Sequence, residues 1–403
     1  MKYVVLVGDG MADYPRPELD NKTPLQYAAT PHMDLLASRG SMGMVNTVPA
    51  GFPPGSDVAN LSVLGYPPEK YYTGRSPLEA VSMGVELEDR DVAFRCNLVT
   101  LSDDEPYDSK RMVDYSAGEV SSSEARELVE AVNDRLGSAT RRFYPGISYR
   151  HLLVWRDGPE RAALTPPHDI PGRTVAEYLP RGEGADELLE LMRRSYPILA
   201  GHPVNRARVE KGLRPANSIW LWGQGKRPSL PPFKDLYGLE GAVISAVDLI
   251  MGIGICAGLR VIKVPGATGN INTNYRGKAE AALRALREGA DLVYLHVEAP
   301  DEAGHQGDTG TKVRAIEEID RNVLGLLLEG LAEFGPYRLL LLPDHPTPLS
   351  IRTHTAEPVP YVIMNSQDVG TTARHYCEAA AAAAGIVVPD GPSLMKMFVA
   401  GVG

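Results

Sequence analysis

The sequence predicts an α/β fold: a doubly wound, mostly parallel sheet with an α+β domain inserted into it. Short, continuously apolar runs rich in β-branched residues recur in the first and last parts of the 403-residue chain and alternate with helical patterns. Strands that are apolar throughout are typical of a parallel sheet covered by helices on both faces. The middle of the chain instead carries longer alternating strands (Val92–Leu101 and His151–Trp155), turns rich in Asp and Pro, and proline clusters. These features indicate a separate α+β domain.

The strands of the parallel sheet are expected at five apolar runs: Tyr3–Val7, Arg260–Val264, Leu292–Val297, Arg338–Leu342 and Val359–Ile363. The helices between them follow from residue spacing. Apolar residues recur every three or four positions in Lys312–Phe334, which predicts an amphipathic helix. The Ala- and Leu-rich segment Lys278–Arg287 predicts a second helix, and the alanine run Ala379–Ala384 a third.

One apolar stretch, Ala242–Leu259, has the length of a membrane span and a single charge. That charge, Asp248, lies near the middle, where a carboxylate costs about 2.5–3.5 kcal/mol on insertion scales. Gly252, Gly254 and Gly258 interrupt the stretch further. A strand and a helix, followed by a second strand from Arg260, fit better than a membrane span.

The inserted domain is expected at residues 86–239, between two parts of the α/β domain at residues 1–85 and 240–403. The charge run Glu86–Asp91 marks the first boundary. The proline-rich segment Lys226–Pro232, a stiff linker composition, marks the second.

Composition excludes several classes of protein. The chain has 41 Lys and Arg against 51 Asp and Glu, a formal net charge of −10, whereas nucleic-acid binders carry a basic excess. Its three cysteines are far apart and form no CxxC pair, so neither a disulfide framework nor a zinc knuckle is expected. The N-terminal apolar run is too short for a signal peptide and no cleavage pattern follows it. We therefore expect a cytoplasmic protein that binds neither nucleic acid nor membrane.

Four groups of reactive side chains are expected at the carboxyl ends of strands, where open α/β sheets place their ligands. They are Asp9, Ser56, Asp301 with His305, and Asp344-His345 with His354 nine residues further on. Each group alone has an ordinary interpretation as a turn, a helix cap or a surface pair. Together they supply three Asp, three His and one Ser, and carboxylate and imidazole are the ligands of zinc or manganese. Seven such groups are too many for one tetrahedral ion and fit two.

The order of the motifs DGM, PGSD, DEAGH, PDH and HT resembles the alkaline phosphatase superfamily. Within it, the sequence is similar to the archaeal-type, cofactor-independent phosphoglycerate mutases. The resemblance covers essentially the whole chain and implies a sheet of alkaline-phosphatase type. It includes the segments Thr73–Ala80, Phe94–Leu101, Thr165–Gly172, Pro215–Gly225 and Val264–Gly269.

The resemblance implies two metal ions per chain, with Mn²⁺ favoured and Zn²⁺, Mg²⁺ or Co²⁺ as alternatives. Asp301, His305 and His354 would hold one ion. The other would be held by Asp9, Asp344, His345 and the Ser56 oxygen. A serine hydroxyl is a weak nucleophile that coordination to a divalent cation activates, so Ser56 is the expected nucleophile.

The implied reaction is the interconversion of 3-phosphoglycerate and 2-phosphoglycerate, a step of glycolysis and gluconeogenesis, by two in-line phosphoryl transfers through phosphoserine. Glycerate must stay enclosed between the transfers, so the inserted domain is expected to act as a lid. Arg75, Arg95, Asn97 and His168 lie in segments that resemble the family's and are expected to bind the small phosphorylated substrate. Homo-oligomerisation stays open.

Three other functions compete with the mutase. Bacterial proteins similar to this one carry a proposed homoserine kinase assignment, which would keep the metal and serine chemistry and change donor and acceptor. A phosphatase would pass the phosphoryl group to water, and the large insertion argues against it. A non-catalytic binding protein is disfavoured because all seven metal and nucleophile positions are present.

Overall fold

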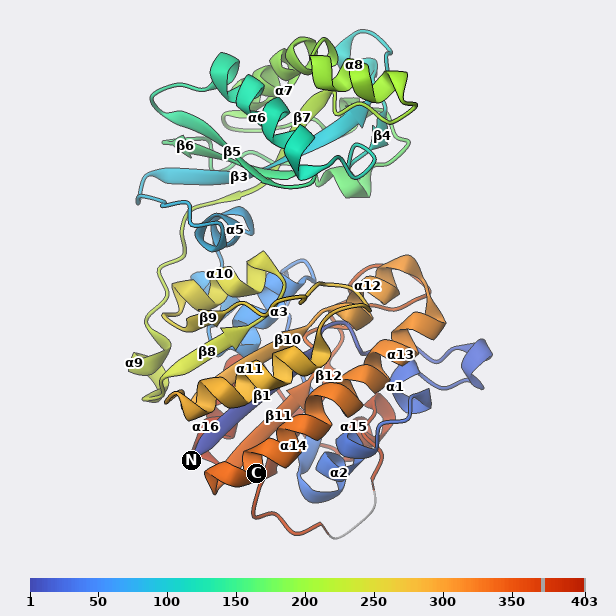
Figure 1. Ribbon diagram of the computed structural model, residues 1–403, viewed down its shortest axis with the longest axis vertical. Helices are drawn as coiled ribbons and strands as arrows, with labels where there is room; N and C mark the ends of the chain where they lie inside the picture. The colour runs from blue at the N-terminus through green and yellow to red at the C-terminus, as the bar shows by residue number, and fades with distance from the viewer. Residues whose placement is uncertain (371–373, 402–403) are drawn as a thin grey trace. The chain divides into compact units, whose positions relative to one another are not determined.

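The computed structural model describes residues 1–370 and 374–401. The chain divides into two compact units. The first combines residues 1–72 with the chain from Ser229 onward, and the second is the contiguous segment Thr73–Pro228 (Figure 1). Each unit is described by itself.

The first unit is built on an eight-stranded sheet, counted over the described residues. Its order is β13 (Val387–Val388), β2 (Ser41–Val45), β12 (Val359–Asn365), β11 (Tyr337–Leu342), β1 (Lys2–Gly8), β10 (Leu292–Val297), β8 (Gly241–Ile244) and β9 (Arg260–Ile262). Only β12 is antiparallel to its neighbours β11 and β2, and every other neighbouring pair is parallel. The predicted mostly parallel sheet is confirmed, and all five predicted strands are present.

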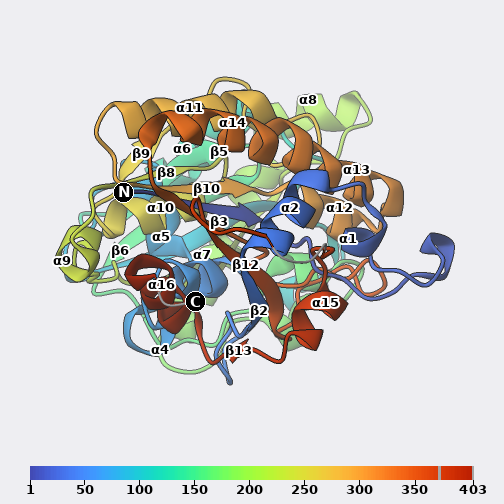
Figure 2. The same cartoon turned by 90° about the horizontal axis from the view of Figure 1, so that it is seen from below.

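Helices cover both faces of this sheet, as Figure 2 shows. Side chains alternate between faces along β1: Val4 and Leu6 join the core beneath one helical layer, whereas the ring of Tyr3 lies 5.6 Å from that of Phe398 on the other side. The first layer contains α2 (Pro31–Arg39), α11 (Tyr275–Arg287), α13 (Thr309–Ile319) and α14 (Gly325–Leu331). The second contains α3 (Ser56–Val63), α10 (Asp248–Cys256) and α16 (Gly391–Ala400), in which α3 packs on both others. The doubly wound arrangement is therefore confirmed.

The predicted helix Lys312–Phe334 is interrupted. Between α13 and α14, residues Asp320–Leu324 form a π-helical turn, and residues Ala332–Phe334 end the segment as a 3₁₀ turn. The interruption places the buried Asp320 carboxylate at the start of α2, where it accepts hydrogen bonds from the backbone N–H groups of His32 (3.3 Å) and Met33 (2.8 Å). Since the N-cap residue Thr30 makes no side-chain cap, Asp320 supplies the cap of α2 from a distant part of the chain.

The remaining elements of this unit are short. They are the 3₁₀ turn Pro17–Leu19 and the helices α1 (Pro24–Tyr27), α4 (Pro68–Tyr71), α9 (Phe233–Tyr237), α12 (Ala299–Gln306) and α15 (Glu378–Ala383). The apolar stretch Ala242–Leu259 forms β8 and α10, as predicted. Among the described residues, no helix combines the length and the apolar character needed to cross a bilayer.

The second unit has a five-stranded antiparallel sheet and is of α+β type. Its central strand β3 (Asp91–Leu101) pairs with β6 and β7 along its length and with β4 at its end. The other strands are β4 (Met112–Asp114), β5 (Arg141–Ile147), β6 (Arg150–Arg156) and β7 (Ser218–Gly225). Helices α6 (Ser122–Leu136), α7 (Ala185–Ala200) and α8 (Pro203–Glu210) accompany the sheet, and α6 and α7 share a core with it.

Both boundaries of the second unit, Thr73 and Pro228, lie earlier in the chain than the predicted positions 86 and 239. Helix α5 (Ser76–Ser82) packs on β3 and β7, and its Ala80 is buried with Ala93 and Leu152, so the second unit begins at Thr73. At the other end, Phe233 N donates to Ala257 O within the first unit. The chain from Ser229 therefore belongs to the α/β unit, and the composition boundary at Glu86 falls inside the second unit.

Candidate active site

Three neighbouring parallel strands bring the predicted carboxylates together. β1 lies between β10 and β11, and Asp9 follows β1 directly, while Asp344 comes two residues after β11. Asp301 lies on α12, which begins two residues after β10. The loop after β1 lies so close to α12 that a Cβ on Gly10, whose φ is +64°, would lie 2.7 Å from Asp301 Cα. Only glycine fits there.

The first predicted ligand group is assembled. Asp301 and His305 lie four residues apart on one face of α12, with His305 Nε2 3.2 Å from Asp301 Oδ2. His354 Nε2 lies 3.4 Å from Asp301 Oδ1 and 2.9 Å from His305 Nε2. These three side chains are close enough to hold one metal ion.

The electrostatics of this group favour positive charge. Burial works against ionisation of Asp301, but its contacts with His305 and His354 hold its pKa well below the usual range. Burial likewise opposes protonation of His305, but the hydrogen bond to Asp301 and its charge raise the pKa of His305 to about 9. The carboxylate therefore attracts a cation to this position, whether a proton or a metal ion.

The second predicted group converges on one nitrogen. His345 Nε2 lies 3.0 Å from Ser56 Oγ, 3.4 Å from Asp344 Oδ2 and 3.6 Å from Asp9 Oδ1. Asp9, Asp344 and His345 are fully buried. Burial, followed by the charges of Asp344 and Asp301, raises the pKa of Asp9 well above its usual value. The Oδ1 atom of Asp9 has no hydrogen-bond partner among the described residues. Buried carboxylates this close need a compensating cation.

Ser56 does not cap its helix. The N-cap of α3 is Gly55, and Ser56 is the first helical residue, with its side chain directed to His345 rather than to the backbone. A ten-residue loop separates it from β2, so it does not follow a strand directly as predicted. The start of α3 leaves backbone N–H groups without helical partners, which suits a phosphoryl group on Ser56.

Two polar residues near the site were not predicted. His296, in the apolar strand β10, has Nε2 3.0 Å from Asp9 Oδ2, and it forms a further metal-compatible cluster with Asp9 and Asp344. Asn60 donates to Asp344 Oδ2 (2.7 Å) and to Ser56 O (2.9 Å), and accepts from Tyr294 OH (2.6 Å). In the sequence, His296 stands out only as a polar residue in the apolar run Leu292–Val297, and Asn60 is one of several polar residues of its segment.

The four predicted substrate-binding residues lie in the second unit, in one connected network. Arg75 Nε lies 2.9 Å from Glu79 Oε1, and Arg95 pairs with the same oxygen. Burial, opposed by the charge of Glu79, lowers the pKa of Arg95 to about 10. The Arg95 guanidinium lies over the ring of Trp222, with 5.2 Å between its Cζ and the ring centroid.

Trp222 connects Arg95 to the other two predicted residues. Its Nε1 donates to Asn97 Oδ1 at 3.0 Å, and the ring of His168 packs edge-on against it at 5.2 Å. The side chain of Arg95 is only 7% exposed, whereas those of Arg75 and His168 are 34% and 46% exposed. The network therefore has a buried centre and two more accessible members.

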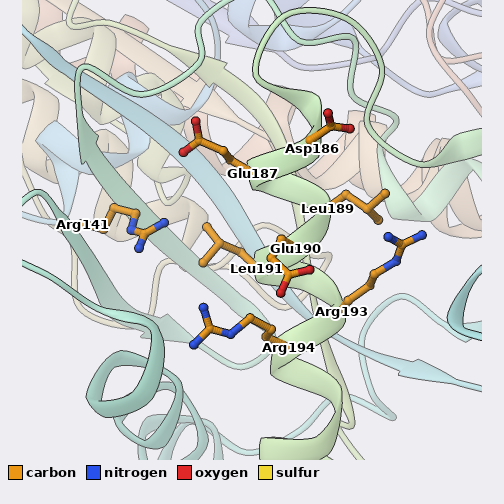
Figure 3. A pocket seen from close by; sticks show the side chains of 8 residues that line it. All are labelled: Arg141, Asp186, Glu187, Leu189, Glu190, Leu191, Arg193 and Arg194. Atoms are coloured by element: carbon orange, nitrogen blue, oxygen red, sulfur yellow. The ribbon is translucent and has the colours of Figure 1, made fainter.

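A hollow of about 450 Å³ lies elsewhere on the second unit (Figure 3). Its lining mixes both signs of charge and contains none of the predicted site residues. It consists of Arg141 and seven residues of α7: Asp186, Glu187, Leu189, Glu190, Leu191, Arg193 and Arg194. It gives no support to a functional site.

Comparison with known proteins identifies the family. The sequence profile described as 2,3-bisphosphoglycerate-independent phosphoglycerate mutase matches residues 37–205. The probable mutase of that description from Geobacter sulfurreducens is 57% identical over 99% of both chains. The mutase from Methanothrix thermoacetophila is 52% identical over the whole of both. The chain belongs to the 2,3-bisphosphoglycerate-independent phosphoglycerate mutase family.

Solved structures agree with this membership. The cofactor-independent phosphoglycerate mutase of Thermoplasma acidophilum superposes with a TM-score of 0.64 at 27% identity, with complete coverage of both chains. A Pyrococcus horikoshii protein gives 0.81 at 28% identity, covering 99% of this chain and 96% of its own. The phosphoglycerate mutase family that the motifs predicted is thereby confirmed.

Proposed function

We propose that this member of the mutase family interconverts 3-phosphoglycerate and 2-phosphoglycerate through a phosphoserine on Ser56. The convergence of Ser56 Oγ, Asp9 and Asp344 on His345 Nε2 carries the proposal, because it places a nucleophile where buried carboxylates and imidazole meet. The small phosphorylated substrate then follows from the family.

The donor set fits two divalent cations. Asp301, His305 and His354 would hold one ion, and these three are close enough to do so as they stand. Asp9, Asp344, His345 and Ser56 would hold the other, and Mn²⁺ is the ion that the resemblance to the family favours. The buried Oδ1 of Asp9, which accepts no hydrogen bond from the described residues, is the observation that supports a cation in the second group. When bound, the ions would polarise the Ser56 hydroxyl and neutralise the oxygens of the phosphoryl group.

The proposed reaction consists of two phosphoryl transfers through Ser56. Ser56 Oγ gives up its proton and forms a bond to phosphorus as the bond from phosphorus to the 3-oxygen of the substrate breaks. The 3-oxygen takes up one proton, so that the leaving group is glycerate and the proton balance of the transfer is zero. The 2-hydroxyl of glycerate then gives up its proton and bonds to phosphorus as the bond from phosphorus to Ser56 Oγ breaks, and Ser56 Oγ takes up one proton, which restores the hydroxyl. The first backbone N–H groups of α3 donate to the phosphoryl oxygens in both transfers, and no water enters.

We assign substrate binding to Arg75, Arg95, Asn97 and His168. Arginine forks suit a carboxylate, and the shared contact with Glu79 holds two of them in place. We further assign the second unit the role of a lid, which must move to admit substrate and exclude water. Solution scattering with and without metal and 3-phosphoglycerate tests this motion, and an unchanged profile in all states contradicts it.

The direct test is a product assay with purified, metal-loaded protein. With 3-phosphoglycerate alone, we expect 2-phosphoglycerate by ³¹P NMR, and homoserine with ATP should give no phosphohomoserine. Protein quenched during turnover should carry phosphate on the peptide that contains Ser56. Product only from homoserine and ATP would instead establish the kinase alternative, and inorganic phosphate as the main product would establish a phosphatase.

A further inference from the structure

One buried hydroxyl contacts both candidate ligand groups. Thr347 lies three residues after Asp344 and has no exposed surface. Its Oγ1 donates to Asp301 Oδ1 at 2.5 Å and lies 3.2 Å from His345 Nδ1. Asp301 belongs to the first group and His345 to the second, so Thr347 links them.

The number of protons available at this contact determines which ring nitrogen of His345 is protonated. A hydroxyl has one proton to donate, and Thr347 gives it to Asp301, which as a carboxylate can only accept. The contact with His345 therefore requires Nδ1 to carry a proton and to donate it to Thr347 Oγ1. A neutral imidazole then has its lone pair on Nε2, the nitrogen that faces Ser56, Asp9 and Asp344.

The backbone of Thr347 is held by a buried ion pair. Its carbonyl accepts from Lys312 Nζ at 2.8 Å, and Lys312 is paired with Asp13 Oδ2 at 2.7 Å. Asp13 also accepts from Leu349 N at 3.1 Å, and Thr347 N donates to Ala12 O at 3.2 Å. The loops after β1 and β11 are thus joined on both sides of Thr347.

Two glycines leave the room that Thr347 needs. A Cβ on Gly10 would lie 2.6 Å from Thr347 Oγ1, and one on Gly304 would lie 2.6 Å from Thr347 O. The hydroxyl of Thr347 therefore lies against Gly10 and its carbonyl against Gly304, at positions where any side chain would collide with it. Such close support is what holds a ligand-orienting group in one geometry.

We propose that Thr347 is a positioning residue that holds His345 in the Nδ1–H tautomer and ties its orientation to that of Asp301, so that both ligand groups are preorganised together. The proposal rests on the assignment of His345 and Asp301 as ligands under the proposed function. It concerns how these ligands are oriented and adds no step to the reaction.

The tautomer is tested on the metal-free wild-type protein by ¹⁵N NMR of labelled histidine, assigned with His345→Gln. We expect His345 to show a protonated Nδ1 and an unprotonated Nε2. A protonated Nε2 with an unprotonated Nδ1 overturns the proposal. This measurement needs neither activity nor a folded variant of Thr347.

Thr347→Val keeps the shape of the side chain and deletes its hydroxyl, whereas Thr347→Ser keeps the hydroxyl. Loss of a group that orients ligands costs roughly 10–100-fold in metal affinity. We expect that loss for Mn²⁺ in Thr347→Val by titration calorimetry, together with a changed Co²⁺ absorption spectrum, and recovery of both in Thr347→Ser. Wild-type affinity and spectrum in Thr347→Val contradict the proposal.

The outcomes separate this inference from the proposed function. If the tautomer and the metal effects are found but no 2-phosphoglycerate forms, Thr347 orients the ligands of a different enzyme. If the wild-type protein is an active mutase but Thr347→Val binds Mn²⁺ normally, the positioning role alone is wrong.

Discussion

Replacement of Ser56 by alanine should separate stability from catalysis. The substitution deletes one hydroxyl whose hydrogen bond to His345 Nε2, at 3.0 Å, is worth about 1 kcal/mol. It removes no helix cap, because the N-cap of α3 is Gly55, and alanine is slightly the better helix former. We therefore expect the free energy of unfolding to fall by at most about 1 kcal/mol, and the melting temperature by about 2–4 °C.

The effect on turnover should be far larger. The phosphoryl group has no other carrier in the proposed mechanism, and loss of a covalent nucleophile typically costs at least about 10⁴-fold in rate. Conversion of 3-phosphoglycerate followed by ³¹P NMR measures this directly. Metal content by mass spectrometry should show that Asp9, Asp344 and His345 still retain an ion, with weaker affinity.

Ser62→Ala is the matched control. Ser62 lies on the same helix, and its hydroxyl likewise makes one hydrogen bond to another segment, accepting from Gly391 N at 3.2 Å. It should lose similar stability and keep its turnover. Mutase turnover above about one hundredth of wild type in Ser56→Ala, on the rate scale above, or phosphate trapped on another residue, would show that Ser56 is not the nucleophile.

Three further predictions concern metal, acid stability and the approach of the loops. Asp301→Ala should lose one of two bound ions by metal analysis while its circular dichroism stays unchanged, and two retained ions would contradict the ligand assignment. Burial and the charge of Arg95 lower the pKa of His151 to about 3, against about 6.5 when unfolded, so the unfolded chain gains a proton that the folded chain does not as pH falls below 6.5. On account of this group, the free energy of unfolding should fall by up to about 1.4 kcal/mol per pH unit toward pH 4. Urea unfolding at several pH values should show a weaker pH dependence for His151→Gln, smaller by the uptake of one proton on unfolding. Equal pH dependence in the two proteins would refute this. Gly10→Ala should cost more than about 2 kcal/mol in urea unfolding, because strain at positive φ adds to contacts of 2.6–2.8 Å, whereas Gly385→Ala, at φ +69° with open space around it, should cost only about 1 kcal/mol. Equal losses would show that the close approach around Gly10 is unimportant.

The sequence was sufficient for the central strands of the main sheet, because β1, β10, β11 and β12 are buried and almost wholly apolar. The short strands β2 and β13 were not predicted. Strand ends indicated three of the candidate ligands, because Asp9, Asp301 and Asp344 each come within four residues of the end of a strand. Their grouping with the other candidates was implied by the resemblance to the family and stays a prediction.

The sequence could not indicate His296, Asn60 or Thr347, since each is a polar residue whose role depends on a partner from another segment. It also missed the start of the second unit, because nothing in the sequence of α5 indicates that it packs on β3 and β7.

The two units also differ in when their strands can pair during synthesis. All five strands of the second unit come from one stretch of chain, Thr73–Pro228, so that unit can fold as soon as this stretch leaves the ribosome. Strand β1 is made first, but both of its neighbours, β10 and β11, come from beyond residue 290. At translation rates of about 5–20 residues per second, β1 waits on the order of tens of seconds with the backbone N–H and C=O groups of both its edges unpaired. The same holds for β2, whose neighbours β12 and β13 are made later still. The nascent chain is thus exposed to aggregation through both of these strands until the C-terminal part of the first unit has been made.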